Sequence, residues 1–257
     1  MTYPARLYPR VGALGRRAAS INRPETCFAH ASVSVNSQRG VVRSSVRRAW
    51  VQFSLDPDSL VDAVALMESR GPVKAVFLDR DGVINQNRLD HVKSWSEFRF
   101  LPGAPEAVAR LSRAGVRVFV VTNQAIINRG MVPRATVALI NQLMVREIAE
   151  RGGCIEDVAY CPHRPDEGCS CRKPRPGLLL QLAQKHALDL RETAIVGDSL
   201  ADVAAGQAVG CQAILVLTGR GREQLGFLRS GGENGFAAVA DLAAAVELLL
   251  SPTAVLS

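Results

Sequence analysis

The pattern of apolar and polar positions divides the chain into two regions. Residues 1–66 show no sustained helical or alternating period of apolar side chains. From Lys74 onward, apolar runs of strand length alternate with segments of helical period, and this order predicts a parallel sheet with crossover helices. The predicted strands are Lys74–Asp79, Val116–Thr122, Asp157–Tyr160, Thr193–Gly197 and Gln212–Leu217, and helices are expected after Pro105, Pro133, Pro176 and Ser199 and at 238–250.

These elements predict one α/β domain, a doubly wound Rossmann-like parallel sheet. The first strand is expected at the centre, between the strand that ends in Thr122 and the strand that ends in Gly197, with ligands bound at the carboxyl edge. The intervals from Asp81 to Thr122 and from Thr122 to Lys173 hold no insertion long enough for a full cap domain. The site is therefore expected to be open to solvent.

The N-terminal region, 1–66, is rich in Arg and Ser and poor in acidic residues over most of its length. This composition is typical of a disordered arm or of a targeting segment. Met67 begins a plausible compact protein, so a misassigned start or an inert tail is another interpretation, and a partner-binding arm is a further one. We expect an extension at 1–66 and a compact domain at 67–257.

Charge and hydropathy narrow the class of protein. The formal net charge is +7, but residues 1–55 hold nine Arg and one Glu, which is +8, so residues 56–257 carry −1. The compact region therefore lacks the basic excess that nucleic-acid binding requires. No apolar run approaches the roughly 18 residues of a membrane span. We expect neither nucleic acid nor a membrane as a partner of this region.

Carboxylates, a hydroxyl and a lysine follow the predicted strands. Asp79 and Asp81 leave the first strand, where one carboxylate could attack phosphorus while the other transfers a proton, although such a DG sequence alone could also be a solvated turn. Thr122 can donate to phosphate oxygens, and Lys173 can neutralise the nucleophile. Asp198 offers a hard oxygen ligand for Mg²⁺. A phosphate dianion approaches an aspartate only beside cations, so the metal and the lysine are needed together.

A second group of residues has the composition of a metal site. Three thiolates and one imidazole within eleven residues would fill the tetrahedral shell of a structural Zn²⁺, and they are Cys161, His163, Cys169 and Cys171. The bound loop would hold Arg172 and Lys173 rigidly. Zinc thiolates persist in a reducing compartment, which favours the cytoplasm. A zinc-dependent nucleic-acid-binding protein with a basic arm is the alternative of another class.

The other cysteines and one histidine are not expected to contribute chemistry. Cys27, Cys154 and Cys211 lie outside the zinc spacing. His186 lies on a helix rich in Gln and Lys, so its side chain is expected to face solvent.

From Val73 to Thr218 the chain resembles the haloacid dehalogenase (HAD) superfamily of phosphatases, because DxDG, a Thr after the second strand, a Lys and GDxxxD occur in that family's order. The resemblance implies Mg²⁺-dependent hydrolysis of a phosphate monoester by a phosphatase domain at 67–257. The implied catalytic roles are nucleophile for Asp79, general acid then base for Asp81, and phosphoryl stabilisation for Thr122 and Lys173. The implied Mg²⁺ ligands are Asp79, Asp198 and the backbone carbonyl of Asp81. Asp202 is expected to orient these ligands.

The zinc loop, CxHx5CxCRKP, resembles that of the zinc-containing subgroup of this superfamily. The subgroup includes the D-glycero-D-manno-heptose 1,7-bisphosphate 7-phosphatases, which HVKSW at 91–95 and FLPGA at 100–104 favour, and, next, the histidinol-phosphate phosphatases. The implied substrate is a small phosphorylated sugar that loses its C7 phosphate. We expect the protein to be a monomer. Two departures lie near the expected sugar pocket: a bulky Ala125–Ile127 after TNQ, and His91 where Tyr is frequent. The substrate-binding residues expected are Asn123, Gln124, Arg129 and Arg172.

Overall fold

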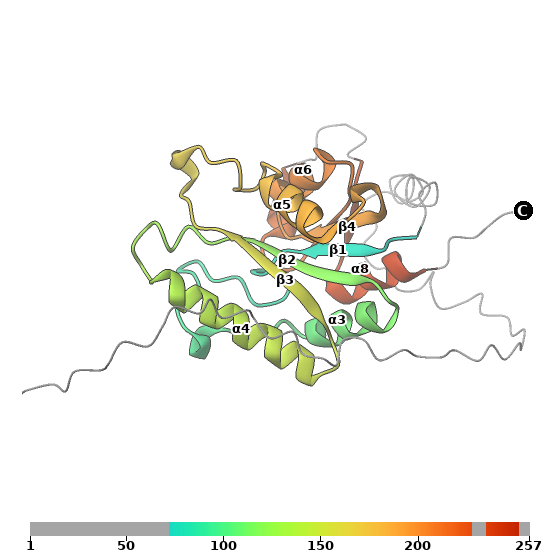
Figure 1. Ribbon diagram of the computed structural model, residues 1–257, viewed down its shortest axis with the longest axis horizontal. Helices are drawn as coiled ribbons and strands as arrows, with labels where there is room; N and C mark the ends of the chain where they lie inside the picture. Colours follow the sequence, from blue (N-terminus) through green and yellow to red (C-terminus); the bar gives the residue numbers. More distant parts are fainter. Residues whose placement is uncertain (1–71, 228–234, 252–257) are drawn as a thin grey trace, which may run out of the picture. The chain divides into compact units, whose positions relative to one another are not determined.

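The structure, a computed structural model, describes residues 72–227 and 235–251, so the extension expected at 1–66 and the start of the compact domain at Met67 lie outside the described residues. At its centre is a six-stranded parallel sheet in the order β3-β2-β1-β4-β5-β6 (Figure 1). The doubly wound α/β prediction is confirmed, with β1 between β2 and β4. The strands are β1 Ala75–Leu78, β2 Arg117–Asn123, β3 Ile155–Cys161, β4 Thr193–Gly197, β5 Gln212–Val216 and β6 Ala237–Val239.

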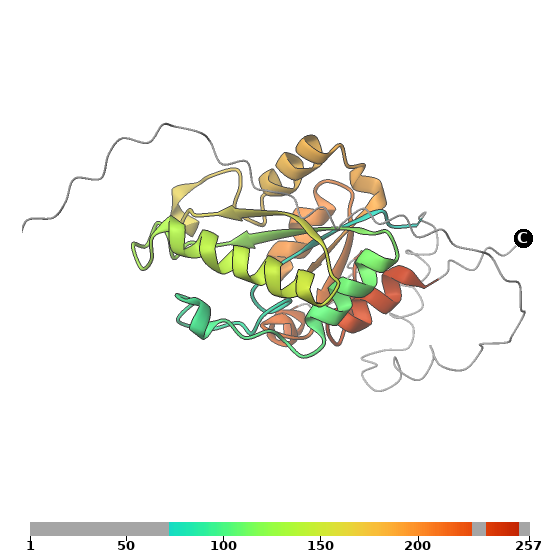
Figure 2. The same cartoon turned by 60° about the horizontal axis from the view of Figure 1, so that its bottom comes forward.

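Helices cover both faces of the sheet, because side chains of a strand alternate between its two faces. Val76 and Leu78 of β1 belong to the core that includes α3, α4 and α8, whereas Ala75 and Phe77 belong to the core that includes α5 and α6 (Figures 1 and 2). The helices are α3 Ala104–Arg113, α4 Arg134–Glu150, α5 Gly177–His186, α6 Leu200–Gln207, α7 Gly221–Gly226 and α8 Leu242–Leu250.

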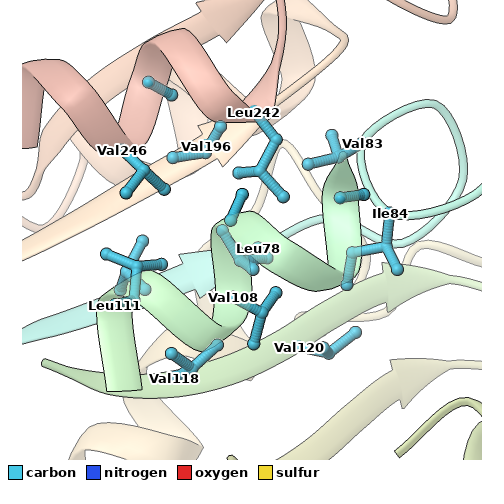
Figure 3. Packing of buried hydrophobic residues seen from close by; sticks show 14 of the residues in the cluster. Leu78, Val83, Ile84, Val108, Leu111, Val118, Val120, Val196, Leu242 and Val246 are labelled. Atoms are coloured by element: carbon cyan, nitrogen blue, oxygen red, sulfur yellow. The ribbon is translucent and has the colours of Figure 1, made fainter. Parts of the chain in front are cut away.

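The first of these cores packs the sheet against α3 and α8 (Figure 3). Leu78 and Val196 come from adjacent strands, Val108 and Leu111 come from α3, and Leu242 comes from α8. All five are at most 3% exposed. Each such burial contributes about 1.5–3 kcal/mol, so the central strands form a firm base for the loops that follow them.

The C-terminal part of the sheet differs from the prediction. A helix was expected from residue 238, but Ala237–Val239 forms the edge strand β6, and α8 begins only at Leu242. The side chain of Asp241 accepts a hydrogen bond of 2.9 Å from the N–H of Ala244 and so caps this helix. A three-residue strand carries too little alternation to be recognised in sequence. Helix α7 and the start of β3 at Ile155 were also not predicted.

The connection from β1 to α3, residues 79–103, holds little regular structure. Within the described residues it contains one 3-10 turn, Trp95–Glu97, and no inserted cap domain. The carboxyl edge of the sheet is therefore bordered by loops, as expected. Among the described residues, no helix is both long and apolar enough to cross a lipid bilayer.

Candidate active site

A buried lysine connects two carboxylates at the carboxyl edge of the sheet. Lys173 Nζ lies 2.9 Å from Asp79 Oδ1 and 2.5 Å from Asp202 Oδ1, and it donates a hydrogen bond of 2.7 Å to the carbonyl of Val121. Asp79 directly follows β1, and Lys173 follows the loop with the zinc spacing. The side chains of all three charged residues are at most 8% exposed. Residues distant in sequence thus meet at one point, as the strand order predicted.

Asp202 holds this lysine from the first turn of α6. Its Oδ2 accepts hydrogen bonds from the Ser199 N–H (3.1 Å) and from Ser199 Oγ (2.7 Å), and the first of these belongs to the capping box of the helix. With Oδ2 used in this way, Oδ1 is directed to Lys173. Asp202 therefore fixes the position of the Lys173 ammonium, and its expected role in orienting Mg²⁺ ligands stays a prediction.

Asp198, which directly follows β4, is fixed by a loop that was not recognised in the sequence. The N–H of Arg220 donates to Asp198 Oδ2 at 2.9 Å, and the Arg220 guanidinium lies 3.7 Å from Oδ1. Two glycines make this approach possible. A Cβ on Gly82 or on Gly219 would lie 2.1 or 2.2 Å from Asp198 Oδ2. The TGRG run after the fifth strand was the available signal, since glycines at a strand end permit close backbone approach.

The carboxylates fit a hard divalent cation. Asp79, Asp198 and Asp202 offer oxygens that all lie within 4.8 Å of one another. The Oδ1 atom of Asp198 is buried and accepts no hydrogen bond in the described part of the chain, whereas those of Asp79 and Asp202 face Lys173. Burial raises the pKa of Asp79 and of Asp198, and neighbouring carboxylates add to the rise. Three carboxylates and one ammonium leave a charge of −2, which one Mg²⁺ would neutralise.

Asp81 is held by a different set of partners. Arg80 Nη2 donates to both carboxylate oxygens (3.1 and 2.9 Å), Asn85 Nδ2 donates to Oδ1 (2.9 Å) and Gln124 Nε2 donates to Oδ2 (2.7 Å). Burial acts to raise the pKa of Asp81, but the charge of Arg80 and these hydrogen bonds outweigh it and lower the pKa. The carboxylate is 22% exposed, so it reaches the solvent side of the site.

The residues at the end of β2 and directly after it form contacts mainly within the protein. Thr122 Oγ1 accepts a hydrogen bond of 2.9 Å from Gln124 Nε2, which leaves its O–H proton available for a phosphate oxygen. Asn123 exchanges hydrogen bonds of 3.1 and 3.2 Å with the backbone of Lys173. The amides of Asn123 and Gln124, expected to contact substrate, are therefore engaged in positioning Lys173, Asp81 and Thr122.

The other two residues expected to bind substrate lie on the bordering loops. Arg172 Nη1 donates to the carbonyl of His163 at 3.2 Å. Arg129 Nη1 lies 3.0 Å from His91 Nε2, and His91 has a positive φ of 62°. Burial and the charge of Arg129 lower the pKa of His91, which favours a neutral imidazole that accepts from the guanidinium. The departure noted at His91 thus contacts an expected substrate residue.

The predicted zinc ligands converge at the end of β3. The sulfur atoms of Cys161, Cys169 and Cys171 lie 3.3–3.5 Å from one another, and His163 Nδ1 is 3.5 Å from Cys161 Sγ and 3.3 Å from Cys171 Sγ. These separations approach the roughly 3.8 Å edge of a Zn–thiolate tetrahedron. Burial, followed by the hydrogen bond with Cys171, raises the pKa of the Cys161 thiol. Four donors of this type, grouped as a cluster, fit Zn²⁺.

Comparisons with known proteins agree with this geometry. Residues 170–245 match the HAD-hydrolase-like family model. The D-glycero-beta-D-manno-heptose-1,7-bisphosphate 7-phosphatase of Bordetella bronchiseptica is 43% identical over 178 residues, 69% of this chain and 98% of that protein. A D-glycero-alpha-D-manno-heptose-1,7-bisphosphate 7-phosphatase of Mycobacterium bovis is 38% identical over 138 residues, 53% of this chain and 73% of that protein.

The chain belongs to the HAD-like hydrolases. A crystal structure of the B. bronchiseptica D,D-heptose 1,7-bisphosphate phosphatase, complexed with magnesium and phosphate, superposes with a TM-score of 0.65, at 43% identity over 69% of this chain and 98% of that one. Within its family the chain is a phosphatase, a phosphoric monoester hydrolase most like the heptose-bisphosphate 7-phosphatases.

Proposed function

We propose that this phosphatase hydrolyses the C7 phosphate of a D-glycero-D-manno-heptose 1,7-bisphosphate through an aspartyl-phosphate intermediate. The observation that carries the proposal is the buried Asp79, which faces the Lys173 ammonium at 2.9 Å beside two further carboxylates. The names of the relatives support the substrate. One of these relatives is named for the beta anomer and the other for the alpha anomer, so the proposal covers either anomer of the substrate.

In the first step, an Asp79 oxygen forms a bond to phosphorus, and the bond between phosphorus and the C7 oxygen breaks. Asp81 gives its proton to the departing oxygen, so the sugar leaves as an alcohol. Thr122 donates its O–H to the transferring group, and Lys173 offsets negative charge on the nucleophile. In the second step, water attacks phosphorus, Asp81 accepts its proton, and inorganic phosphate is released as the Asp79 carboxylate re-forms.

The proposed Mg²⁺ ligands are Asp79, Asp198 and the backbone carbonyl of Asp81, with Asp202 holding Lys173 rather than the ion. When bound, Mg²⁺ would supply the positive charge that lets a phosphate dianion approach a carboxylate. Cys161, His163, Cys169 and Cys171 are the proposed ligands of a structural Zn²⁺ that fixes the loop before Arg172 and Lys173.

The remaining assignments follow from the same arrangement. We propose that Arg172 and Arg129 bind the phosphate or sugar part that is not hydrolysed, since planar guanidinium groups suit phosphate. Asn123 and Gln124 would act on the substrate through the residues they hold. The catalytic domain would span 67–257, act as a monomer and work in the reducing cytoplasm, where zinc thiolates persist.

Two measurements test this function. The variant Asp79→Asn should keep its fold but lose turnover, and intact mass after rapid quenching should show a phosphorylated protein only in the parent. Retention of substantial activity in the variant would exclude the covalent mechanism. Comparison of kcat/KM for the heptose bisphosphate and for histidinol phosphate tests the substrate assignment. A higher kcat/KM for histidinol phosphate would refute the assignment of a heptose bisphosphate.

A further inference from the structure

Arg80, which lies between Asp79 and Asp81 in the chain, is a buried cation. Its side chain is 1% exposed. Its Nη1 donates a hydrogen bond of 2.9 Å to Asn141 Oδ1 on α4, and its Nη2 contacts both oxygens of Asp81. Replacing a buried charged residue with a hydrophobic residue of similar volume often leaves the protein equally stable, because burial of a charge costs several kcal/mol of hydration free energy. Packing alone therefore does not account for an arginine here.

The contacts of Arg80 restrict how Asp81 can point. An ionised carboxylate has about four lone-pair positions, and Asp81 accepts four contacts, two from Arg80 and one each from Asn85 and Gln124. Hydrogen bonds from a charged donor are roughly twice as strong as those from a neutral amide. When Asp81 carries the proton that it gives to the leaving oxygen, it has fewer acceptor positions, so one of the amide contacts gives way and the contact with Arg80 persists.

We propose that Arg80, anchored to α4 by Asn141, is a positioning residue that sets the orientation of the Asp81 carboxylate for proton transfer to the leaving oxygen. This proposal rests on the role given to Asp81 in the proposed function. Arg80 acts without touching the substrate, because its guanidinium is buried behind Asp81. Proton transfer requires a donor–acceptor distance of about 2.6–3.2 Å, so a small rotation of the carboxylate should be costly.

The test compares leaving groups. A sugar alkoxide must be protonated as it departs, whereas p-nitrophenolate leaves without a proton. In Arg80→Met, kcat/KM for the heptose bisphosphate should fall at least about tenfold, which is part of the roughly 10²–10⁴-fold that a general acid supplies. In the same variant, kcat/KM for p-nitrophenyl phosphate should change less than about threefold. Arg80→Lys should give an intermediate loss, because an ammonium can reach Asp81 but not Asn141 at the same time.

Controls separate this proposal from the proposed function and from loss of stability. Asp81→Asn should show the same selectivity for leaving groups; if it does not, the role of Asp81 itself fails. If Asp81→Asn lowers kcat/KM only for the heptose bisphosphate, whereas Arg80→Met lowers kcat/KM equally for both substrates, only the positioning role of Arg80 is overturned. Ile140→Ala, a buried change next to Asn141 on α4, should affect both substrates alike.

Asn141→Leu covers the case in which Arg80→Met does not fold. This variant keeps Arg80 opposite Asp81 and removes only the acceptor that anchors it. A smaller selective loss, about threefold or more on the heptose bisphosphate, is expected. Equal losses on the two substrates, or none on either, would overturn the proposal.

Discussion

Replacing Lys173 with Met should destabilise the protein through two uncompensated carboxylates. The change removes the ammonium that lies 2.9 Å from Asp79 Oδ1 and 2.5 Å from Asp202 Oδ1, where the three side chains are 2%, 8% and 2% exposed. Removal of one partner from a buried ion pair costs about 3–5 kcal/mol, because the other charge stays buried without compensation. A loss of this size in the free energy of unfolding is expected at about pH 8 without added magnesium.

The loss of unfolding free energy in the Lys173→Met variant should become smaller as the pH falls. Burial raises the pKa of Asp79 above its unfolded value of 3.8, and the Lys173 ammonium opposes this rise, so its removal raises the pKa further. A carboxyl whose pKa is raised by folding stabilises the folded state fully below its unfolded pKa, and this contribution is lost as the pH rises through the folded pKa. On acidification, proton uptake by Asp79 therefore increases the free energy of unfolding more in the variant than in the parent.

Urea unfolding followed by circular dichroism, without a chelator so that zinc is retained, measures both quantities. At about pH 5.5 the deficit of the Lys173→Met variant should be below about half of its value at pH 8. A deficit under about 1 kcal/mol at pH 8, or equal deficits at the two pH values, would refute the argument that Lys173 compensates buried carboxylates.

Three further predictions concern the metals. Gly219→Ala should weaken Mg²⁺ binding at least about tenfold in titration calorimetry, because its Cβ would lie 2.2 Å from Asp198 Oδ2. The control is Gly115→Ala, which is also at positive φ but has open space around its Cβ. It should cost a similar backbone strain of about 1–2 kcal/mol and leave Mg²⁺ affinity unchanged. Mg²⁺ affinity should rise between about pH 6 and pH 8, because the raised pKa values of two carboxylates let protons compete; a flat profile would contradict this. Cys169→Ser should lower the zinc content by mass spectrometry and raise KM more than it lowers kcat, whereas an unchanged KM in zinc-depleted protein would argue against the scaffold role.

Much of the candidate site could be predicted from the sequence because its residues follow strands. Asp79, Thr122 and Asp198 each follow or end an apolar run, and parallel strands bring such positions to one edge. The cluster of three cysteines and one histidine could be predicted for a different reason, since its spacing within one loop does not depend on long-range packing.

The partners of these side chains could not be predicted, because they depend on contacts between distant segments. Arg80 and Asn141 are 61 residues apart, and nothing local links them. Arg220 reaches Asp198 only because the loop after β5 folds back toward it. The expectation that His186 faces solvent is wrong, since its side chain is 11% exposed and its Nε2 lies 2.9 Å from an Asp157 oxygen. A helix's composition does not reveal which of its turns meets the sheet.

The central place of β1 has a consequence for how the enzyme matures. Ala75 of β1 pairs with Arg117 on one side and with Thr193 on the other. Asp79, the proposed nucleophile, follows β1 and is synthesised early, whereas Asp198 follows β4 and emerges much later. A nascent polypeptide that has left the ribosome only as far as the cysteine-rich loop at 161–171 contains Asp79, Asp81 and Thr122. It still lacks Asp198 and Asp202. The proposed Mg²⁺ site would then be incomplete on an unfinished chain, and Mg²⁺ binding would select molecules in which the crossover to β4 has already closed.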